Sequence, residues 1–188
     1  MIGWLVIGTA KYFELGVNCL QSIKDNYKGE HESQYFLFTD RAHELSDELD
    51  WITTIDINHI PFPYISMARY AHFIDRQHLF SDCDYLYYRD ADSLFVDVGD
   101  EILSKRTTVL HPSYYMNEPD THPYDRNPNC NAYIPFGSGK QYYQNCFQGG
   151  EKEEFLKMSL LLRDRTQEDL SNNIIPLWHD ESHMNKYM

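Results

Sequence analysis

Short apolar runs alternate with segments of helical periodicity along the first half of the chain. The apolar runs, each typical of a buried strand, are residues 4–7, 35–38, 51–57 and 85–88. Between them, residues 12–26 place apolar side chains on one helical face, and residues 66–80 are also expected to be helical. Ser66 is a suitable N-cap for the second of these helices. The alternation predicts an α/β fold, in which helices flank a mostly parallel central sheet.

The second half of the chain has a less regular pattern. Prolines, asparagines and tyrosines interrupt residues 111–135, which we expect to form an ordered loop beside a site. Residues 142–147 should return to the sheet, and Gly149-Gly150 should end that strand. A helix is expected over residues 151–165, with acidic residues in its first turn. Its inward-facing residues should be Phe155, Leu156, Met158, Leu161 and Leu162.

Length and charge limit both the organisation of the chain and its partners. With 188 residues, the chain is expected to form a single domain over residues 1–188. The net charge of −13 disfavours nucleic acid as a partner, because binding to its phosphates depends on clustered lysine and arginine. The apolar start, residues 1–8, is too short for a transmembrane anchor and lacks a basic leader, so a soluble, cytoplasmic protein is expected.

Two carboxylates, Asp90 and Asp92, directly follow the apolar run at residues 85–88. In an open parallel sheet, ligands bind beyond the carboxyl ends of the strands, so both side chains should lie at the binding edge. Residues separated by one position point the same way in an extended chain, where they can share one cation. Their oxygen atoms favour Mg²⁺ or Mn²⁺ over zinc. The alternative is a pair of ordinary acidic turn residues.

Arg69 and Tyr12 also fit a site for a phosphorylated ligand. An arginine can bind a phosphate or a carboxylate through two hydrogen bonds, and a tyrosine after the first strand can stack on a nucleobase. The alternatives are a surface salt bridge for Arg69 and a core position at the start of a helix for Tyr12. Taken one residue at a time, both interpretations remain open.

The last eleven residues, 178–188, are dense in groups that bind a polyol or stabilise an electron-poor carbon. His179 and His183 are four positions apart, as in zinc hydrolases of the HExxH type. In that motif the glutamate directly follows the first histidine, whereas Glu181 is two positions after His179. A structural alternative is a C-terminal helix that is capped by Ser182 or Asp180 and places Trp178 in the core.

The segment WHDESHMNKY, at residues 178–187, is the longest of several motifs that share an order with a known family. The other motifs are Phe38-Thr-Asp40, Ser66-Met-Ala-Arg69, Asp84-Tyr-Leu86, Asp90-Ala-Asp92, Leu110-His-Pro112, Ala132-Tyr-Ile-Pro135, Tyr142-Tyr143 and Gly149-Gly150. Together they resemble glycosyltransferase family 6, the family of the ABO blood-group transferases and the α-1,3-galactosyltransferase. The resemblance covers nearly the whole chain.

The resemblance implies a GT-A (Rossmann-like) nucleotide-sugar transferase fold and a retaining reaction. A hexose (galactose, N-acetylgalactosamine or glucose) would pass from a UDP-sugar to a hydroxyl of an acceptor glycan and form an α-linkage. The nucleotide-binding part would cover about residues 1–98, and the acceptor- and sugar-binding part about residues 99–188. Two alternatives remain, a UDP-sugar-binding module with weak turnover and a zinc-dependent hydrolase that uses His179 and His183. No oligomeric state is implied.

The resemblance also assigns roles to individual residues. Asp90 and Asp92 would hold Mn²⁺ or Mg²⁺, with Asp92 as the main ligand. The donor-binding residues would be Ile7, Thr9, Tyr12, Arg69, Asp90, Ala91, His179 and Asp180. Glu181 would be the catalytic carboxylate beneath the anomeric carbon. The residues of the acceptor and sugar pocket would be His111, Ser113, Gln144, Asn145, Cys146 and Trp178.

Three features of this implied site remain open. Glu181 suits either route to retention, because it can form a glycosyl-enzyme intermediate or stabilise an oxocarbenium-like state during front-face attack. Gln144 and Cys146 are bulkier than glycine, which leaves less room for an acetamido group and favours an unsubstituted hexose. Lys140 and Lys186 are candidates to cover the diphosphate of the donor.

Overall fold

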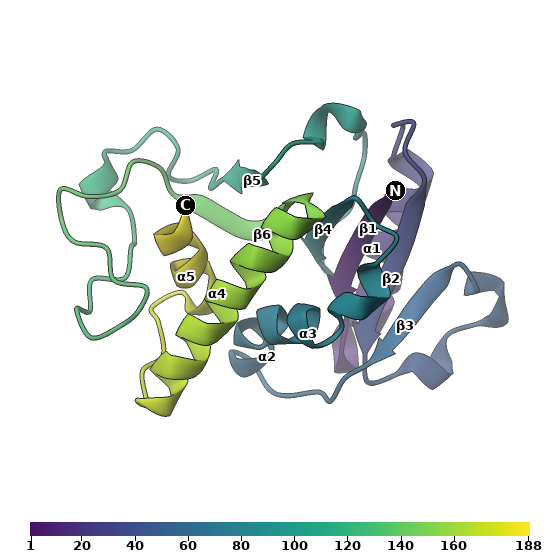
Figure 1. The fold of residues 1–188 in the computed structure, drawn as a ribbon, viewed down its shortest axis with the longest axis horizontal. Helices are drawn as coiled ribbons and strands as arrows, with labels where there is room; N and C mark the ends of the chain where they lie inside the picture. The colour runs from purple at the N-terminus through teal and green to yellow at the C-terminus, as the bar shows by residue number, and fades with distance from the viewer. The chain divides into compact units, whose positions relative to one another are not determined.

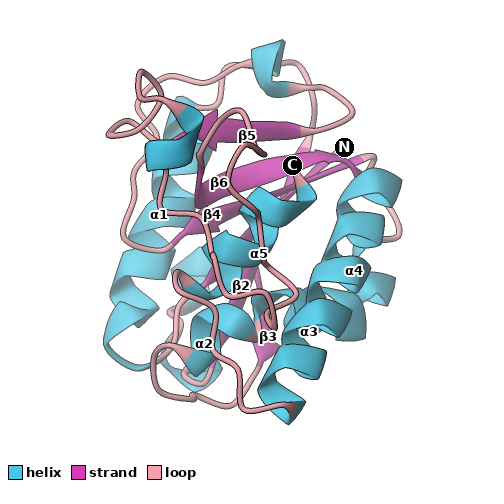
Figure 2. Ribbon diagram, turned by 90° about the vertical axis from the view of Figure 1, so that its left-hand side faces the viewer, coloured by secondary structure: helices cyan, strands magenta, loops and turns pink.

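The computed structural model describes all residues from 1 to 188 and is an α/β structure with one six-stranded, mostly parallel sheet (Figures 1 and 2). Its strands are β1 (Ile2–Ile7), β2 (Ser33–Thr39), β3 (Ile52–Asp56), β4 (Tyr85–Asp90), β5 (Thr107–Leu110) and β6 (Tyr143–Glu151). Its α-helices are α1 (Phe13–Asn26), α2 (Tyr64–Met67), α3 (Arg69–Asp75), α4 (Lys152–Ser171) and α5 (His179–Tyr187). The strand order is β3-β2-β1-β4-β6-β5, which confirms the predicted fold class. None of the helices combines the length and the apolar character that are needed to cross a bilayer.

The chain forms two compact units, each of which combines segments that are distant in sequence. Unit 1 consists of Met1–Ile60, Arg76–Thr107 and Cys146–Phe155. Unit 2 consists of Pro61–Asp75, Thr108–Asn145 and Leu156–Met188. The expected single domain, with parts that divide at about residue 98, stays a prediction.

Unit 1 is built around β1, which pairs in parallel with β2 on one side and with β4 on the other. Because β1 is a central strand, both of its faces are covered and its sequence is almost continuously apolar. Ile2, Trp4, Leu5 and Val6 are completely buried. The indole nitrogen of Trp4 still finds a partner, since it donates a hydrogen bond of 3.0 Å to the hydroxyl of Ser33. Helix α1 packs on β1, β2 and β4.

The strand register brings the carboxyl ends of β1, β2 and β4 together. Ile7, the last residue of β1, lies opposite Phe38 of β2 and opposite Asp90, the last residue of β4. The turn that follows β1 and the turn that follows β4 therefore begin side by side. This arrangement confirms that Asp90 lies at the carboxyl edge of the sheet.

Unit 2 contains α2, α3, α5 and most of α4, together with the largely irregular segment at residues 111–135. That segment is a loop as predicted, apart from a 3-10 turn at Pro119–Thr121. Although irregular, it contributes to a buried cluster of Tyr124, Ile134 and Tyr142, against which Tyr114 packs. Its aromatic residues therefore serve as core, which explains why a segment with no periodicity is ordered.

The prediction of one helix over residues 66–80 is wrong. The segment forms two helices, α2 and α3, and then a 3-10 turn. It begins earlier, because Tyr64 N–H donates to the carbonyl of Pro61 and opens α2. Ser66 is therefore an interior residue of α2 and not an N-cap. The helix also ends earlier, because Arg76 leaves helical geometry (φ −116°, ψ 13°) and a 3-10 turn follows.

Two predictions about the segment from 142 to 165 are also wrong. Gly149 and Gly150 lie within β6 and do not end it. A Cβ atom on Gly149 would approach the carbonyl oxygen of Leu86 and the ring of Tyr87 to 2.3 Å, so glycine lets β6 pass close to β4. Leu161, expected on the inner face of α4, is 39% exposed, whereas Leu162 is buried.

Replacing Gly149 by alanine should lower the free energy of unfolding by about 1–3 kcal/mol, as is typical of overpacking a filled site. The added methyl group meets backbone and a stacked ring, since Tyr87 and Phe147 lie parallel with centroids 5.5 Å apart. Urea unfolding measures the loss. Gly137→Ala is the matched control, because nothing lies within 4 Å of its Cβ position. The φ of +75° at Gly137 strains an alanine there, and this strain should cost less than the overpacking at Gly149. Equal losses in the two variants would contradict the packing explanation.

Candidate active site

In unit 1, the end of β1 and the turn after it carry three of the predicted donor-binding residues, Ile7 in the strand and Thr9 and Tyr12 in the turn. Thr9 is buried, and its hydroxyl lies 3.0 Å from Nδ1 of His59. Tyr12 is 41% exposed, so it is not a core residue. Because the Tyr12 ring is open to solvent beside the end of β1, it is available for stacking. Stacking of Tyr12 on a nucleobase therefore stays a prediction.

A strained backbone conformation follows Thr9 in the same turn. Ala10 has a φ of 48°, a region that residues with a side chain rarely adopt. Two groups from the segment after β2 hold it there. Asp40 Oδ1 accepts the N–H of Ala10 at 2.9 Å, and Arg41 donates to its carbonyl at 2.9 Å. Strain that is fixed by its surroundings is common at ligand-binding turns.

Asp90 and Asp92 lie where β4 ends. The hydroxyl of Tyr88 donates to Asp90 Oδ1 at 2.7 Å, and that of Ser93 donates to the Asp90 carbonyl at 2.5 Å. The chain turns after Asp90, so Asp92 lies in an exposed turn. The premise that the chain stays extended through both carboxylates is therefore wrong.

The donor set at this turn fits a hard divalent cation. Both side chains offer carboxylate oxygens, and Mg²⁺ and Mn²⁺ are usually held by one or two carboxylates together with oxygens of a bound phosphate. No group of three or more His, Cys, Asp or Glu side chains could hold a metal ion by itself. A cation here would need further oxygens besides these two carboxylates, such as those of water or a bound phosphate, and Asp90 and Asp92 as its ligands stay a prediction.

In unit 2, two acidic residues open α5, and the first of them, Asp180, is buried. Arg69, the first residue of α3, is also buried and pairs with Asp180 Oδ2 at 3.2 Å. The side-chain amide of Asn145 donates to the same oxygen at 2.5 Å. Removing one member of such a buried ion pair is strongly destabilising, because the other charge is left unpaired. The predicted Arg69 and Asp180 thus meet, and the surface salt bridge considered for Arg69 is wrong.

Glu181, the predicted catalytic residue, receives a hydrogen bond at each carboxylate oxygen. The hydroxyl of Tyr142 donates to Oε1 at 2.8 Å, and the backbone N–H of Asn145 donates to Oε2 at 3.1 Å. Burial raises the pKa of Tyr142, and the adjacent Glu181 carboxylate raises it further. Tyr142 is therefore a permanent proton donor, which fixes the orientation of the carboxylate.

The predicted pocket residue His111 adjoins this pair. Its N–H donates to the carbonyl of Tyr142 at 2.8 Å, and its ring centroid lies 5.8 Å from that of Tyr142. Ser113 N–H donates to His111 Nδ1 at 3.2 Å, which fixes the imidazole tautomer. Hydrogen bonds therefore connect Ser113, His111, Tyr142 and Glu181 in unit 2.

Trp178 and His179 lead directly into the acidic turn of α5. Trp178 is 47% exposed, so its expected place in the core under the structural alternative is wrong. Its N–H donates to the hydroxyl of Ser182 at 2.9 Å. His179 has a φ of 52° and stacks edge-on against Phe62 with centroids 4.9 Å apart. Burial lowers the pKa of His179. Both rings border the segment that carries Glu181.

The second histidine of the zinc alternative is enclosed in unit 2. His183 is completely buried, with Nε2 3.3 Å from Asp169 Oδ2, and neither ring nitrogen makes a hydrogen bond of good geometry. Asp169 itself accepts from the backbone and side chain of Asn131 and from the thiol of Cys130. Nothing in this arrangement supports a zinc hydrolase.

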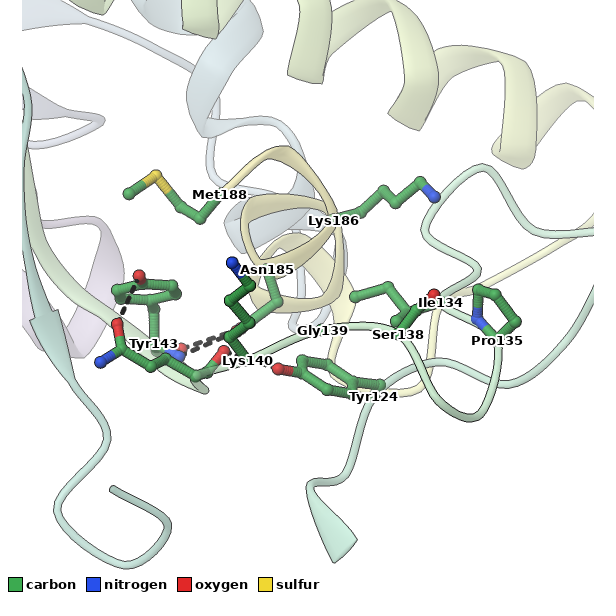
Figure 3. A pocket seen from close by; sticks show the side chains of 11 residues that line it. Tyr124, Ile134, Pro135, Ser138, Gly139, Lys140, Tyr143, Asn185, Lys186 and Met188 are labelled. Carbon is green, nitrogen blue, oxygen red and sulfur yellow. Dashed lines mark hydrogen bonds between the residues drawn. The ribbon is translucent and has the colours of Figure 1, made fainter. Parts of the chain in front are cut away.

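A cavity of about 690 Å³ lies elsewhere in unit 2, between the C-terminal turn of α5 and residues 134–143 (Figure 3). Its lining residues are Tyr124, Ile134, Pro135, Ser138, Gly139, Lys140, Gln141, Tyr143, Asn185, Lys186 and Met188. No predicted donor or catalytic residue lines it. Lys140 and Lys186, the two cations considered for the diphosphate, both line it.

Each unit therefore gathers one part of the predicted site. Unit 1 holds Ile7, Thr9, Tyr12, Asp90, Ala91, Asp92 and Cys146. Unit 2 holds Arg69, His111, Ser113, Gln144, Asn145, Trp178, His179, Asp180 and Glu181. The expected approach of Glu181 to a cation at Asp92 involves both units and stays a prediction. Sequence reasoning gave no role to Tyr142, Asp40 or His59; for Tyr142 and Asp40, their place in family motifs was the available signal.

A comparison with protein families bears directly on this arrangement. The sequence model described as Glycosyltransferase family 6 matches residues 1–188, which is the whole chain. The chain belongs to glycosyltransferase family 6. The resemblance inferred from the separate motifs is thus confirmed over its full extent.

Among its relatives, this family 6 chain is 33% identical over 196 residues to histo-blood group ABO system transferase 2 of Rattus norvegicus, with 100% of the chain and 58% of the relative covered. It is 28% identical to globoside alpha-1,3-N-acetylgalactosaminyltransferase 1 of Gallus gallus, with 99% and 57% covered. It is 24% identical to O-antigen biosynthesis glycosyltransferase WbnI of Escherichia coli, with 100% and 81% covered. The chain thus spans little more than half the length of the two vertebrate relatives.

The buried His183 should make stability depend on pH. Burial lowers its pKa to about 4, although the nearby Asp169 opposes the shift. Because the unfolded chain binds this proton more readily, the contribution to stability is complete above about pH 6.5 and is lost as the pH falls towards 4. The free energy of unfolding should fall there by up to about 1.4 kcal/mol per pH unit.

Chemical unfolding at several pH values measures this slope, and His183→Gln should flatten it. His43→Gln, which replaces an exposed histidine, is the matched control and should keep the wild-type slope. An unchanged slope in His183→Gln would show that other groups cause the acid sensitivity.

Proposed function

We propose that this protein is a retaining glycosyltransferase that moves a hexose from a UDP-sugar to a hydroxyl of an acceptor glycan and forms an α-linkage. Family membership supports glycosyl transfer in general, and the relatives' names include an ABO system transferase and an alpha-1,3-N-acetylgalactosaminyltransferase. The single observation that supports the reaction type best is the Glu181 carboxylate, held by two hydrogen bonds in the first turn of α5.

Glu181 is the proposed catalytic residue because its carboxylate is oriented in advance. Tyr142 and the backbone N–H of Asn145 fix its plane, so little reorganisation is needed when positive charge develops on the anomeric carbon. The carboxylate can then stabilise that charge during front-face attack or bond to the carbon as a nucleophile. Asp180 and Arg69, which are paired beside it, would bind hydroxyls of the donor sugar.

Asp90 and Asp92 are the proposed ligands of Mn²⁺ or Mg²⁺. When bound, the cation would neutralise charge on the diphosphate of the leaving UDP. The turn after β1, with Thr9 and the exposed Tyr12, would bind the uridine. Gln144 and Cys146 favour an unsubstituted hexose such as galactose over N-acetylgalactosamine, because each has a larger side chain than glycine.

Glu181→Gln should lower kcat for hexose transfer by about 100-fold or more, because the amide carries no charge to stabilise the transition state. Release of UDP in the presence of acceptor, for a panel of UDP-sugars with Mn²⁺, is the measurement. Glu153→Gln, at an exposed glutamate in the first turn of α4, is the matched control and should keep the wild-type rate. A Glu181→Gln enzyme with near wild-type turnover would refute the role of Glu181.

Asp92→Asn should raise the Mn²⁺ concentration needed for half-maximal transfer by at least about tenfold, since a charged ligand is lost. A Mn²⁺ titration of UDP-sugar binding, read by calorimetry, checks this without relying on turnover. Asp97→Asn is the control, because Asp97 is exposed, follows the same strand and pairs only with Lys28 among the described ion pairs. Wild-type protein that binds UDP but transfers no hexose to any acceptor would favour the weak binding module instead.

A further inference from the structure

Asn145 occupies a central position in the polar network of unit 2. It lies in β6 and is 4% exposed. Its side-chain amide donates to Asp180 Oδ2 at 2.5 Å and to the hydroxyl of Tyr70 at 3.2 Å. Its carbonyl accepts from Arg69 at 3.0 Å, and its N–H donates to Glu181 Oε2 at 3.1 Å. One residue thus contacts four side chains of α3 and α5.

Two of these contacts reach consecutive residues of one helix. Asp180 and Glu181 are adjacent in the first turn of α5, where successive side chains point about 100° apart. A single partner that bonds both carboxylates, one through its side chain and the other through its backbone, restricts the rotation of the helix and both side-chain torsions.

The side chain of Asn145 is turned away from solvent and towards Asp180. A residue that lines an open sugar pocket would present its side chain to that pocket, whereas this amide is buried and bonds Asp180 and Tyr70. Both of its polar atoms are within hydrogen-bond distance of Tyr70 or Asp180. Its chemistry is therefore suited to holding a carboxylate and not to choosing between donor sugars by its bulk.

We propose that Asn145 is a positioning residue, which sets the geometry of Asp180 and Glu181 for hexose transfer. This inference rests on the proposed function of the acidic turn of α5. The amide supplies a neutral donor that holds Asp180 without adding charge, and the backbone N–H holds Glu181. Arg69 neutralises Asp180 from the other side. Asn145 acts through the two acids and has no contact of its own with the reacting atoms.

Asn145→Asp tests the proposal because it keeps the shape of the side chain and replaces the donor by a carboxylate. Two carboxylates at this distance cannot both be charged without a large cost, so one holds a proton at a higher pH than an isolated aspartate. The groups that face the pair are Arg69, Tyr70 and Glu181. Acidification should restore the missing hydrogen bond by supplying this shared proton.

The expected result is a loss of about 10- to 100-fold in kcat/KM for the donor at about pH 7.5, the usual effect of losing a hydrogen bond to a charged group. The deficit relative to wild type should shrink to about threefold at about pH 5.5, where the proton is shared. Thermal unfolding of the same variant should show a matching recovery at acid pH, a readout that is independent of activity.

Asn131→Asp is the matched control. Asn131 also donates its side-chain amide to a buried aspartate of unit 2, at 2.9 Å from Asp169 Oδ1, but it contacts neither Asp180 nor Glu181. The control should therefore lose stability at neutral pH while the ratio of its kcat/KM to that of wild type stays independent of pH. A merely structural role for Asn145 predicts the same behaviour in both variants.

A wild-type pH profile in Asn145→Asp, or an equal shift in Asn131→Asp, would overturn the proposal. If Asn145→Asp does not fold, Asn145→Ser replaces it, since serine is neutral and too short to reach Asp180. A folded Asn145→Ser with wild-type kcat/KM would overturn the proposal as well. Failure of the wild type to transfer hexose from any UDP-sugar would instead refute the proposed function, and the positioning role would fall with it.

Discussion

The buried charge of Asp180 is the constraint on which the arrangement of unit 2 depends. A carboxylate that is removed from water must be paired and hydrogen-bonded, or it destabilises the fold by several kcal/mol. Here the partners come from α3 and β6, since Arg69 and Asn145 both bond the same oxygen. The pairing fixes the start of α5 with respect to these two segments, and Glu181 takes its place as the next residue of that helix.

In unit 1, backbone hydrogen bonds fix the position of the central strand and of the turn that follows it. Because β1 has parallel neighbours on both sides, its position and register are determined by hydrogen bonds as well as by apolar packing. The turn that follows it is then fixed by Asp40 and Arg41, which bond both backbone groups of Ala10. A rigid sheet edge with well-anchored turns is the usual setting for nucleotide binding in open α/β sheets.

The sequence predicts strands β1, β2, β3 and β4 from their apolar runs and β6 in part, but it misses β5 (Thr107–Leu110), whose four residues form too short a run to stand out. The run before Asp90 is enough to place that carboxylate at the carboxyl edge, and the family motifs single out Arg69 and the acidic turn of α5. What sequence reasoning misses are partnerships over long separations. Nothing in a hydrophobic pattern shows that Tyr142 meets a carboxylate 39 positions later, or that Asn145 meets one 35 positions later. The rule that glycine ends a strand also failed. Gly149 lies within β6 because β4 passes so close that there is no room for a side chain.

His179 has the left-handed backbone conformation, which normally belongs to glycine or asparagine. A selection for heat resistance alone would therefore tend to accept glycine there, since the exchange relieves about 1–2 kcal/mol of torsional strain. The same exchange would delete the ring that rests on Phe62 at the entrance to α5. Relief of backbone strain and packing against Phe62 thus make opposite demands on the residue at position 179.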